Sequence, residues 1–587
     1  MKKNVLALSI AAMIGGLGFA GAASAGVPSG SGTAAASAGV ITGSGTAGAA
    51  GAAVPTAVID AGQFVASSST DLAVSEGGVG HALVMPYYNA QNGNMTVLHV
   101  TNTDTANGKL VKVRFRSAAN SDDVLDFQVF MSPGDVWTAA VTAGADGVAQ
   151  LTTADNTCTV PALTSGVAQK FVQNRLPSYL DAAGKANLTR EGYVEIFNMA
   201  DITGVDAWGT DGTTATGNTQ KSPLYTAIKH VSGVAPCSVA GSAARTRVDT
   251  TATSTLTEAT AAEAGLQTPT TGLMGDWYII NVAQTTTFSG AATAVRATGG
   301  NERGNFVHFP QLDTAAAGTA DNLTADPLFR TNNVFDASGT ASTTPALTLL
   351  NFDVPDMSTP YNGAAAVTTP LNQAQRLAAA LQVKSVTNQY ANDASISAKT
   401  DWVFSMPTRR YNVAANYAAA TSVANAAAAA TVKYRLFTDL GTAGHANDQF
   451  YPAGTVVGTS LAGGNTTVDE NGNICVRADA QRFYDREETT GGTTPVFSPG
   501  TASSVQFCGE VSVLAFADTG NSVLSASVAR RTVTSGSYVN GWGVLNTTNA
   551  GLGLPILGSS FIKLTNPQAA TGMSGTYGIT WPHRFTK

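Results

Sequence analysis

Four cysteines are the residues whose chemistry this 587-residue sequence constrains most directly. They show no C-x-x-C spacing and have no histidine nearby at ligand spacing, so they do not match a zinc site. In an oxidising compartment an even number of cysteines predicts disulfides, and four cysteines allow three pairings. Proximity along the chain favours Cys158–Cys237 and Cys475–Cys508, which puts one bridge in each half.

Two clusters of oxygen-bearing side chains are candidate calcium sites, because Ca²⁺ prefers carboxylate and amide oxygens. The candidate ligands are Asp122, Asp123 and Asp126 in the first cluster, and Asp469, Asn471 and Asn473 in the second. The second cluster opens like a calcium loop, but Ala480 stands where the bidentate glutamate of such a loop is needed. A polar turn before a strand is therefore favoured there, and calcium is kept as a hypothesis for both clusters.

No motif of an enzyme or a cofactor site stands out. There is no H-E-x-x-H and no G-x-S-x-G nucleophile elbow. The segment Gly43–Gly48 matches the G-x-G-x-x-G dinucleotide pattern by letter, but no strand precedes it and no helix follows it. The six histidines share no motif and are predicted to be structural or surface residues: His81, His99, His230, His308, His445 and His583. The sequence therefore predicts a protein that is not an enzyme.

Charged residues are concentrated in a few short segments. The densest are Tyr484–Glu488 and Arg409-Arg410. A catalytic pair of carboxylates would need a cleft and raised pKa values, which a sequence does not reveal. We interpret these segments as ion pairs that fix loops between sheets, or as contacts between neighbouring copies.

The N-terminus predicts export. Lys2 and Lys3 precede an apolar run that ends at the small residues Ala23-Ser24-Ala25, which is typical of a signal peptide over residues 1–25. Residues 26–76 are rich in Gly, Ala and Ser and are predicted to be flexible, because they offer little apolar surface to bury. No later apolar run is long enough for a membrane helix, so no membrane span is expected.

The composition favours assembly over nucleic-acid binding. The formal net charge is −7 and only 12% of the residues are charged, against about a quarter in an ordinary soluble protein. A nucleic-acid partner is disfavoured because the chain has no basic field. A weakly charged, hydroxyl-rich surface gives little repulsion between copies.

The stretch from His81 to Thr142 predicts an antiparallel meander packed on a second sheet. Within it, Val111, Val113 and Phe115 alternate with three basic residues, Lys112, Arg114 and Arg116. Because side chains alternate across a strand, this pattern predicts one buried face and one solvent-exposed face. Two Asn-Gly pairs supply hairpin turns, and Trp277 is predicted to anchor the core of a later strand.

The predicted fold class is mainly β, with antiparallel Ig-like sandwich domains, long Thr/Ala/Gly-rich insertions and a few short helices. We expect an N-terminal sandwich domain over residues 77–310 and a C-terminal β-rich domain over residues 311–587. A helix is predicted near residues 370–383, where a proline opens an amphipathic run. Short strands follow up to the C-terminus, and Val523–Val533 is counted among them.

Several segments together resemble a family of exported proteobacterial cell-surface proteins. They are ALVMPYYNAQNGNMTVLHVTNTD, VKVRFRSAANSDDVLDFQVFMSPGDVWTA, REGYVEIFNMAD, TDWVFSMPTRR, YDREE and the closing WPHRF. The resemblance covers roughly residues 79 to 587, and the best-described relatives are similar to the surface-layer proteins of beta-proteobacteria, including the protein that sheathes vesicle-containing tubes called nanopods. It implies a lattice-forming or coat role, and it carries over no catalytic residues.

We therefore expect a structural protein on the outer face of the outer membrane. Its expected partners are further copies of itself, in a lattice, and outer-membrane lipopolysaccharide. An alternative is a secreted adhesin or ligand-binding surface module, which would need exposed aromatic residues beside polar ones. A secreted hydrolase with an unrecognised carboxylate site ranks lowest.

Overall fold

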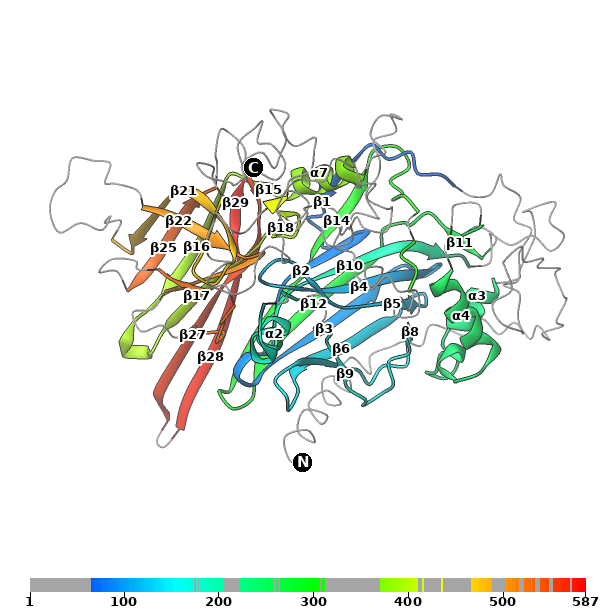
Figure 1. Ribbon diagram of the computed structural model, residues 1–587, viewed down its shortest axis with the longest axis horizontal. Helices are drawn as coiled ribbons and strands as arrows, with labels where there is room; N and C mark the ends of the chain where they lie inside the picture. Colours follow the sequence, from blue (N-terminus) through cyan, green and yellow to red (C-terminus); the bar gives the residue numbers. More distant parts are fainter. Residues whose placement is uncertain are drawn as a thin grey trace.

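The structure is a computed structural model, drawn in Figure 1. It describes residues 65–173, 176–177, 179–204, 222–254, 256, 260–261, 264–306, 308–311, 370–409, 414–415, 434–435, 466–487, 503–516, 522–528, 530–533, 539–547, 553–570 and 573–587. The predicted signal peptide and most of the Ala-rich insertion over residues 413–430 lie outside these residues, as does His445. The fold is mainly β and its sheets are antiparallel, apart from one parallel pair of strands.

Two sheets form the first half of the fold. In spatial order, sheet 1 contains β1 (Asp71–Val74), β14 (Thr293–Thr298), β2 (Ala82–Asn89), β10 (Glu191–Ile202), β4 (Gly108–Ser117), β5 (Asp123–Met131) and β8 (Cys158–Val160), with β11 (Leu266–Gln267) beside β10. Sheet 2 contains β13 (Thr286–Ala291), β12 (Leu273–Asn281), β3 (Asn94–Asn102), β6 (Val136–Ala143), β7 (Ala149–Thr152) and β9 (Gln169–Lys170). Together they make the first sandwich.

Two further sheets form the second sandwich. Sheet 3 contains β20 (Thr466–Val468), β21 (Ile474–Asp485), β25 (Asn540–Asn546), β16 (Ser385–Ala391) and β29 (Arg584–Thr586), with β22 (Ser503–Cys508) beside β21. Sheet 4 contains β24 (Arg530–Thr532), β23 (Val511–Phe516), β17 (Lys399–Ser405), β27 (Leu557–Ala570) and β28 (Met573–Pro582). Two short pairs complete the described strands: β15 (Gln382–Val383) with β26 (Leu554–Pro555), and β18 (Ala414–Ala415) with β19 (Tyr434–Arg435).

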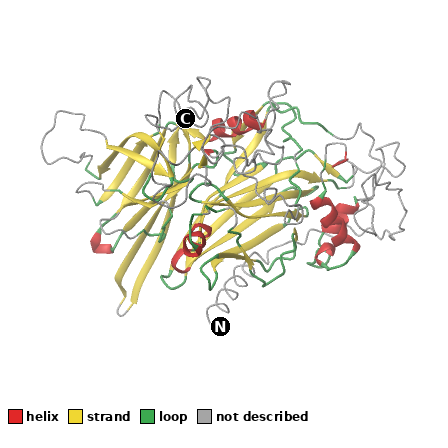
Figure 2. Ribbon diagram, viewed as in Figure 1, coloured by secondary structure: helices red, strands yellow, loops and turns green. Residues whose placement is uncertain are grey.

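The described helices are short and lie outside the sheets (Figure 2). They are α2 (Ala182–Thr189), α3 (Pro223–Ile228), α4 (Ala243–Thr253) and α7 (Pro370–Leu381), with 3₁₀ turns at Gln91–Gly93, Pro236–Ser238 and Ala394–Ile396. Helix α7 confirms the helix predicted near residues 370–383. No helix in the described part of the chain has the length and the apolar character that a membrane crossing requires.

The predicted meander is wrong in its layering. β2, β4 and β5 lie in sheet 1, whereas β3 and β6 lie in sheet 2. The chain therefore crosses between the two layers from β2 to β3, from β3 to β4 and from β5 to β6, while β4 and β5 are neighbours in sheet 1. The 3₁₀ turn at Gln91–Gly93 makes the first of these crossings. The strands themselves were predicted correctly, and the turn at Asn92-Gly93 uses positive φ at both residues.

Two other expectations need correction. The segment predicted to be flexible up to residue 76 contains β1, which pairs with β14. The segment Val523–Val533 is not one strand, because only Arg530–Thr532 pairs in a sheet. Leu524 is instead held in an irregular turn by a bond from its N–H to the carboxylate of Asp401.

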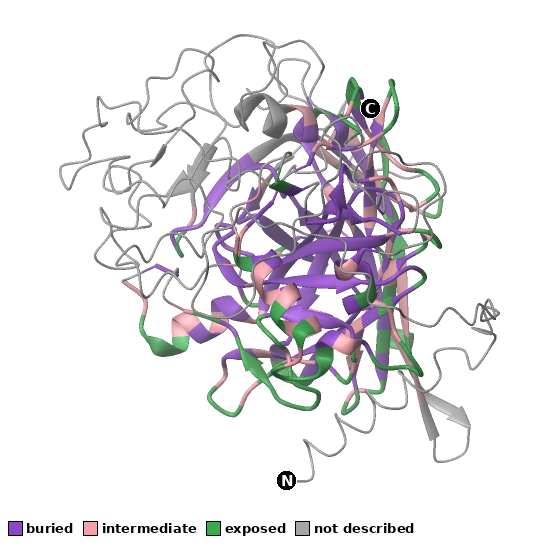
Figure 3. Ribbon diagram, turned by 90° about the vertical axis from the view of Figure 1, so that its right-hand side faces the viewer, coloured by how far each residue is buried: buried purple, intermediate pink, exposed green. Residues whose placement is uncertain are grey.

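The apolar core is continuous between the sandwiches. Trp277 is buried between sheets 1 and 2, as predicted, and its ring lies 5.8 Å from that of Phe561 on β27. Phe561 also contacts Tyr87 of β2, so side chains of sheet 4 are part of the first core. A second core, between sheets 3 and 4, is built around Trp402 and Phe516, whose centroids are 4.8 Å apart. Figure 3 shows the buried strands at the centre of the molecule.

Polar contacts also hold the two sandwiches together. Arg409 is fully buried and ion-paired with Glu510, and it donates to the carbonyl of Ala119 in the first sandwich. At Gly578 of β28, a Cβ atom would lie 2.2 Å from the carbonyl oxygen of Thr287 in β13, so the two backbones approach closely there. The predicted role of Arg409 in fixing loops between sheets agrees with this arrangement.

Candidate functional site

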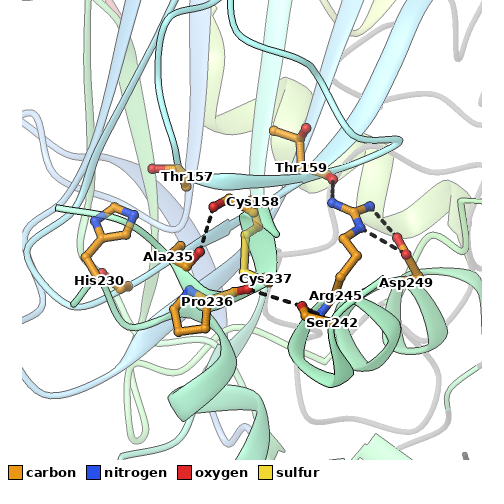
Figure 4. Close-up of a disulfide and its surroundings, with 12 residues drawn as sticks. Thr157, Cys158, Thr159, His230, Ala235, Pro236, Cys237, Ser242, Arg245 and Asp249 are labelled. Atoms are coloured by element: carbon orange, nitrogen blue, oxygen red, sulfur yellow. Dashed lines mark hydrogen bonds and ion pairs between the residues drawn. A yellow bond between two sulfur atoms is a disulfide. The ribbon is translucent and has the colours of Figure 1, made fainter. Parts of the chain in front are cut away.

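The first predicted disulfide ties a helical segment to the edge of sheet 1 (Figure 4). Cys158 of β8 is bonded to Cys237 of the 3₁₀ turn at Pro236–Ser238, with 6.0 Å between their Cα atoms. Beside it, Arg245 of α4 donates to the carbonyl of Thr159 at 2.9 Å and pairs with Asp249. This bridge is structural: it fixes α3 and α4 against the sheet.

The second predicted disulfide joins two neighbouring strands of sheet 3. Cys475 of β21 and Cys508 of β22 are direct partners in the ladder and form the bridge. Nε of Arg531 lies 3.0 Å from Sγ of Cys508. Asp469 and the two sulfur atoms are the only group of potential metal-binding atoms found among the described residues. Because both sulfurs are bonded to each other, neither is a thiolate that could hold a metal ion.

The first candidate calcium cluster has cationic partners from the chain itself. Asp126 is paired with Lys112, and Asp123 lies 3.9 Å from Nη1 of Arg116. Burial raises the pKa of the Asp123 carboxyl, and Arg116 opposes that rise. Asp122 is also buried. A calcium ion would have to compete with these cations, and binding at this cluster stays a prediction.

The second candidate cluster forms a compact polar turn. Oδ1 of Asp469 accepts hydrogen bonds from the N–H groups of Asn471 and Asn473 at 2.9 and 2.8 Å, and Oδ2 accepts from the Asn473 side chain at 3.1 Å. The carboxylate is therefore used to shape the turn that leads into β21. The geometry favours the polar turn that the sequence indicated, and calcium there also stays a prediction.

The three basic residues that alternate along β4 are buried, so the prediction of a solvent-exposed face is wrong. Lys112 is paired with Asp126, Arg116 donates to Glu195 at 3.2 Å, and the guanidinium of Arg114 lies 3.9 Å from the ring centre of Phe309. Burial lowers the pKa of Arg114 to about 10. Neighbouring carboxylates thus neutralise Lys112 and Arg116, whereas Arg114 lies against an aromatic ring.

The covering segments explain this burial. Gln128, beside Lys112 on β5, donates to the carbonyl of Ala252 in α4 and to that of Phe309. Gln311 contacts both Lys112 and Asp126. The face is thus closed by α4 and by residues 308–311, which are far from β4 in the sequence.

The histidines are placed as structural residues where the structure describes them. Nδ1 of His81 accepts a bond from the N–H of Ala297, and His583 bridges Asn388 and the carbonyl of Val403. Burial lowers the pKa of both rings to about 3. No two of the described histidines share a site.

The aromatic side chains that the structure leaves exposed are gathered in the second sandwich. Of the described residues, they are Trp542, Tyr577, Trp581 and Phe585. Three of them lie on the last strands of sheets 4 and 3, and we call these residues the open edge: Tyr577 and Trp581 on β28 and Phe585 on β29. Residue type and spacing alone did not indicate these exposed rings.

The strand register shows why the open edge is exposed. Trp581 pairs with Ser560, which pairs with the core residue Trp402, so Trp581 lies on the face of sheet 4 that is turned towards sheet 3. β28 is the last strand of sheet 4, and Trp581 is nevertheless 42% exposed. Phe585 pairs with the buried Val386 in the same way, at the last strand of sheet 3. Both rings thus lie on inner faces but at the outermost strands, where they stay partly exposed even though Asn388 of β16 donates to the carbonyl of Trp581.

Alternation of Tyr577, Ile579 and Trp581 with smaller residues was visible in the sequence. The segment Tyr577–Trp581 was predicted to be a strand, but the pattern did not reveal that Trp581 stays 42% exposed on the inner face of an edge strand. The chain matches no protein-family model, no curated protein and no solved structure.

Proposed function

We propose that this protein is a non-enzymatic structural protein of the cell surface that associates with copies of itself into a coat. The resemblance of the sequence to surface-layer proteins and the predicted signal peptide support its placement on the outer face of the outer membrane, with lipopolysaccharide as the anchoring partner. The observation that carries the proposal is the open edge, an exposed aromatic surface on a chain with little charge to repel its neighbours.

A second exposed apolar surface lies in the other half of the molecule. Val231, Val234 and Val239 are 67%, 45% and 56% exposed in the connection between α3 and α4, which we call the valine loop. In Figure 1 α3 and α4 lie at one end of the long axis and β28 lies towards the other end. Contacts between two different surfaces at opposite ends propagate from copy to copy instead of closing into a dimer.

The interior of the molecule suits a subunit of a coat. Both disulfides join elements within one sandwich, and the continuous core with the Arg409–Glu510 pair joins the two sandwiches. A rigid subunit loses little conformational freedom when it associates, so many small contacts can add up to a stable array.

The test is the state of the purified mature protein at increasing concentration, followed by sedimentation and by electron microscopy. We expect ordered assemblies for the natural protein and their loss in the double variant Tyr577→Ser/Trp581→Ser. Val282→Ser, which removes an exposed apolar side chain outside both surfaces, serves as the matched control and should assemble normally. Thermal unfolding checks that each variant is folded.

A mixing experiment tests the head-to-tail geometry. The double variant keeps its valine loop, so it should add to one end of an assembly and block growth there. Assemblies of the natural protein should therefore become shorter as the variant is added. A natural protein that stays monomeric at every concentration tested, or a double variant that assembles as well as the control, would overturn the proposal.

A further inference from the structure

The outer face of sheet 3, which is turned away from sheet 4, carries a stacked pair of aromatic rings. Tyr484 of β21 and Trp542 of β25 are direct partners in the ladder. Their ring centres are 4.3 Å apart and their planes differ by 14°. We call these two residues the aromatic pair. The neighbouring residue Phe483 points the other way, into the core against Trp402.

The spacing of the rings fixes how they stand. Adjacent strands in a sheet are about 4.8 Å apart. Two rings on neighbouring strands that stack at a similar distance must project from the sheet with their planes parallel to the strands. Each ring then has one face towards the neighbouring strand on either side. Tyr484 therefore covers one face of the indole of Trp542. The other face is turned towards β16, where the register partner of Trp542 is Gln389.

The surface beside that indole face is polar. Gln389 is exposed, and among the described residues its side-chain amide makes no hydrogen bond, whereas its backbone carbonyl accepts from Trp402 and Ser560. The outward-facing residues of the neighbouring rows carry hydroxyl, amide and guanidinium groups; they are Thr387, Ser385, Asn546, Thr586, Arg482 and Arg584. An aromatic ring that projects from the sheet beside polar side chains offers a ligand both an apolar contact and hydrogen bonds.

We propose that this face binds a glycan chain that carries acidic groups. One face of a pyranose ring consists of C–H groups, which pack on an aromatic face, while its hydroxyls need donors and acceptors at the ring edge. The free indole face of Trp542 supplies the first contact, and Gln389 and Thr387 supply the second.

The local charge selects an acidic glycan. Arg482 and Arg584 lie on either side of Val544 and Thr387 in the row next to the aromatic pair, and both are exposed. Within the described part of the chain, neither has a recorded ion pair. On a chain of net charge −7, two such guanidinium groups form a cationic position that suits a carboxylate or phosphate on the glycan.

Single-stranded nucleic acid is the competing class of ligand, because bases also stack on aromatic side chains. It is disfavoured here because binding of nucleic acid depends on a strip of cations that follows the backbone, whereas the described strand residues of this face supply the two arginines. A cross-strand aromatic pair also stabilises a sheet without any ligand. That role would not require the exposed Gln389 or the two arginines.

The experiment measures binding of the mature protein to polygalacturonate, to dextran and to an oligothymidylate, by affinity electrophoresis and by calorimetry. The protein is kept below the concentration at which it self-associates, so a failure of the coat proposal leaves this test intact. We expect binding to polygalacturonate that weakens with salt, weaker binding to dextran, and none to the oligothymidylate.

The variants locate the site. Trp542→Ala should weaken polygalacturonate binding at least about tenfold, and Arg584→Gln should weaken it and reduce its salt dependence. Tyr278→Ala is the matched control, because it removes a half-buried aromatic ring from the outer face of sheet 2, and it should bind normally. The proposal is overturned if polygalacturonate does not bind, if Trp542→Ala binds as well as Tyr278→Ala, or if dextran or the oligothymidylate binds more tightly.

Discussion

The buried cationic face of β4 and the outer face of sheet 3 both belong to strands in which two kinds of residue alternate. The two faces nevertheless lie in opposite environments. On β4 the basic residues Lys112, Arg114 and Arg116 alternate with apolar ones, and both sets are buried. On sheet 3 Trp542 alternates with glycines and is 41% exposed. An alternating pattern shows that the two faces of a strand differ. It does not show which face another part of the chain covers.

The first prediction places the largest effect on the covered face. Arg116→Ala removes a cation from beside Glu195 and Asp123, both of which are buried. Removing one partner of a buried ion pair leaves a buried charge without compensation and costs about 3–5 kcal/mol. Arg584→Ala removes an exposed arginine from sheet 3 and should change the free energy of unfolding by less than about 0.5 kcal/mol. Urea or guanidinium unfolding measures both.

A small effect of Arg116→Ala would contradict the difference between the two faces, because it would mean that water reaches the covered face. Arg116→Met separates the loss of the charge from the loss of packing, because it removes the charge and keeps a long side chain. If this unbranched apolar variant recovers little of the loss, the cost lies in the carboxylates left without a cation and not in packing.

Strands and cysteine pairing were the parts of this fold that the sequence revealed best. Both depend on local signals: alternation for β4 and β5, and chain proximity for Cys158–Cys237 and Cys475–Cys508. The layering of β2 to β6 was missed because it depends on the path of the chain at Gln91–Gly93, which periodicity does not record.

The surfaces could not be predicted for a related reason. The exposure of Trp581 depends on the place of β28 at the edge of sheet 4, and the burial of Arg114 depends on Phe309, which is distant in sequence. The Tyr484–Trp542 contact depends on a register between two strands more than 50 positions apart. None of these relations leaves a local trace, so residue type alone indicated the wrong environment for Arg114.

The second prediction concerns the response of the covered face to acid. His308 is buried near Lys112, and burial, together with the smaller effect of the Lys112 charge, lowers its pKa from 6.5 to about 3. The unfolded chain therefore binds a proton below about pH 6.5 that the folded chain does not. This histidine thus favours folding at neutral pH, and its contribution is lost as the pH falls from about 6.5 towards 3, by about 2 kcal/mol at pH 5.

The variant His308→Asn isolates that contribution from those of the other buried groups, such as His81 and Asp401. The difference in unfolding free energy between pH 7 and pH 5 should be about 2 kcal/mol smaller in the variant than in the natural protein. Asp401 acts in the opposite direction, because burial raises its pKa to about 6 and its protonation favours the folded chain as the pH falls. An unchanged pH dependence in His308→Asn would place His308 in contact with water.

The last and smallest effect concerns the aromatic pair, and it decides whether that pair serves stability or binding. A double-mutant cycle with Tyr484→Ala and Trp542→Ala measures the free energy of their interaction in unfolding experiments. Cross-strand pairs on an exposed face contribute about 0.2–1 kcal/mol, and we expect a value in that range. If the coupling energy is instead as large as the loss from Arg116→Ala, the outer face of sheet 3 behaves like an interior. The stack would then be a structural element that lies at the surface. An aromatic pair that binds a ligand must keep one ring face accessible, so it contributes little to the free energy of folding and most of its interaction energy is gained when the ligand binds.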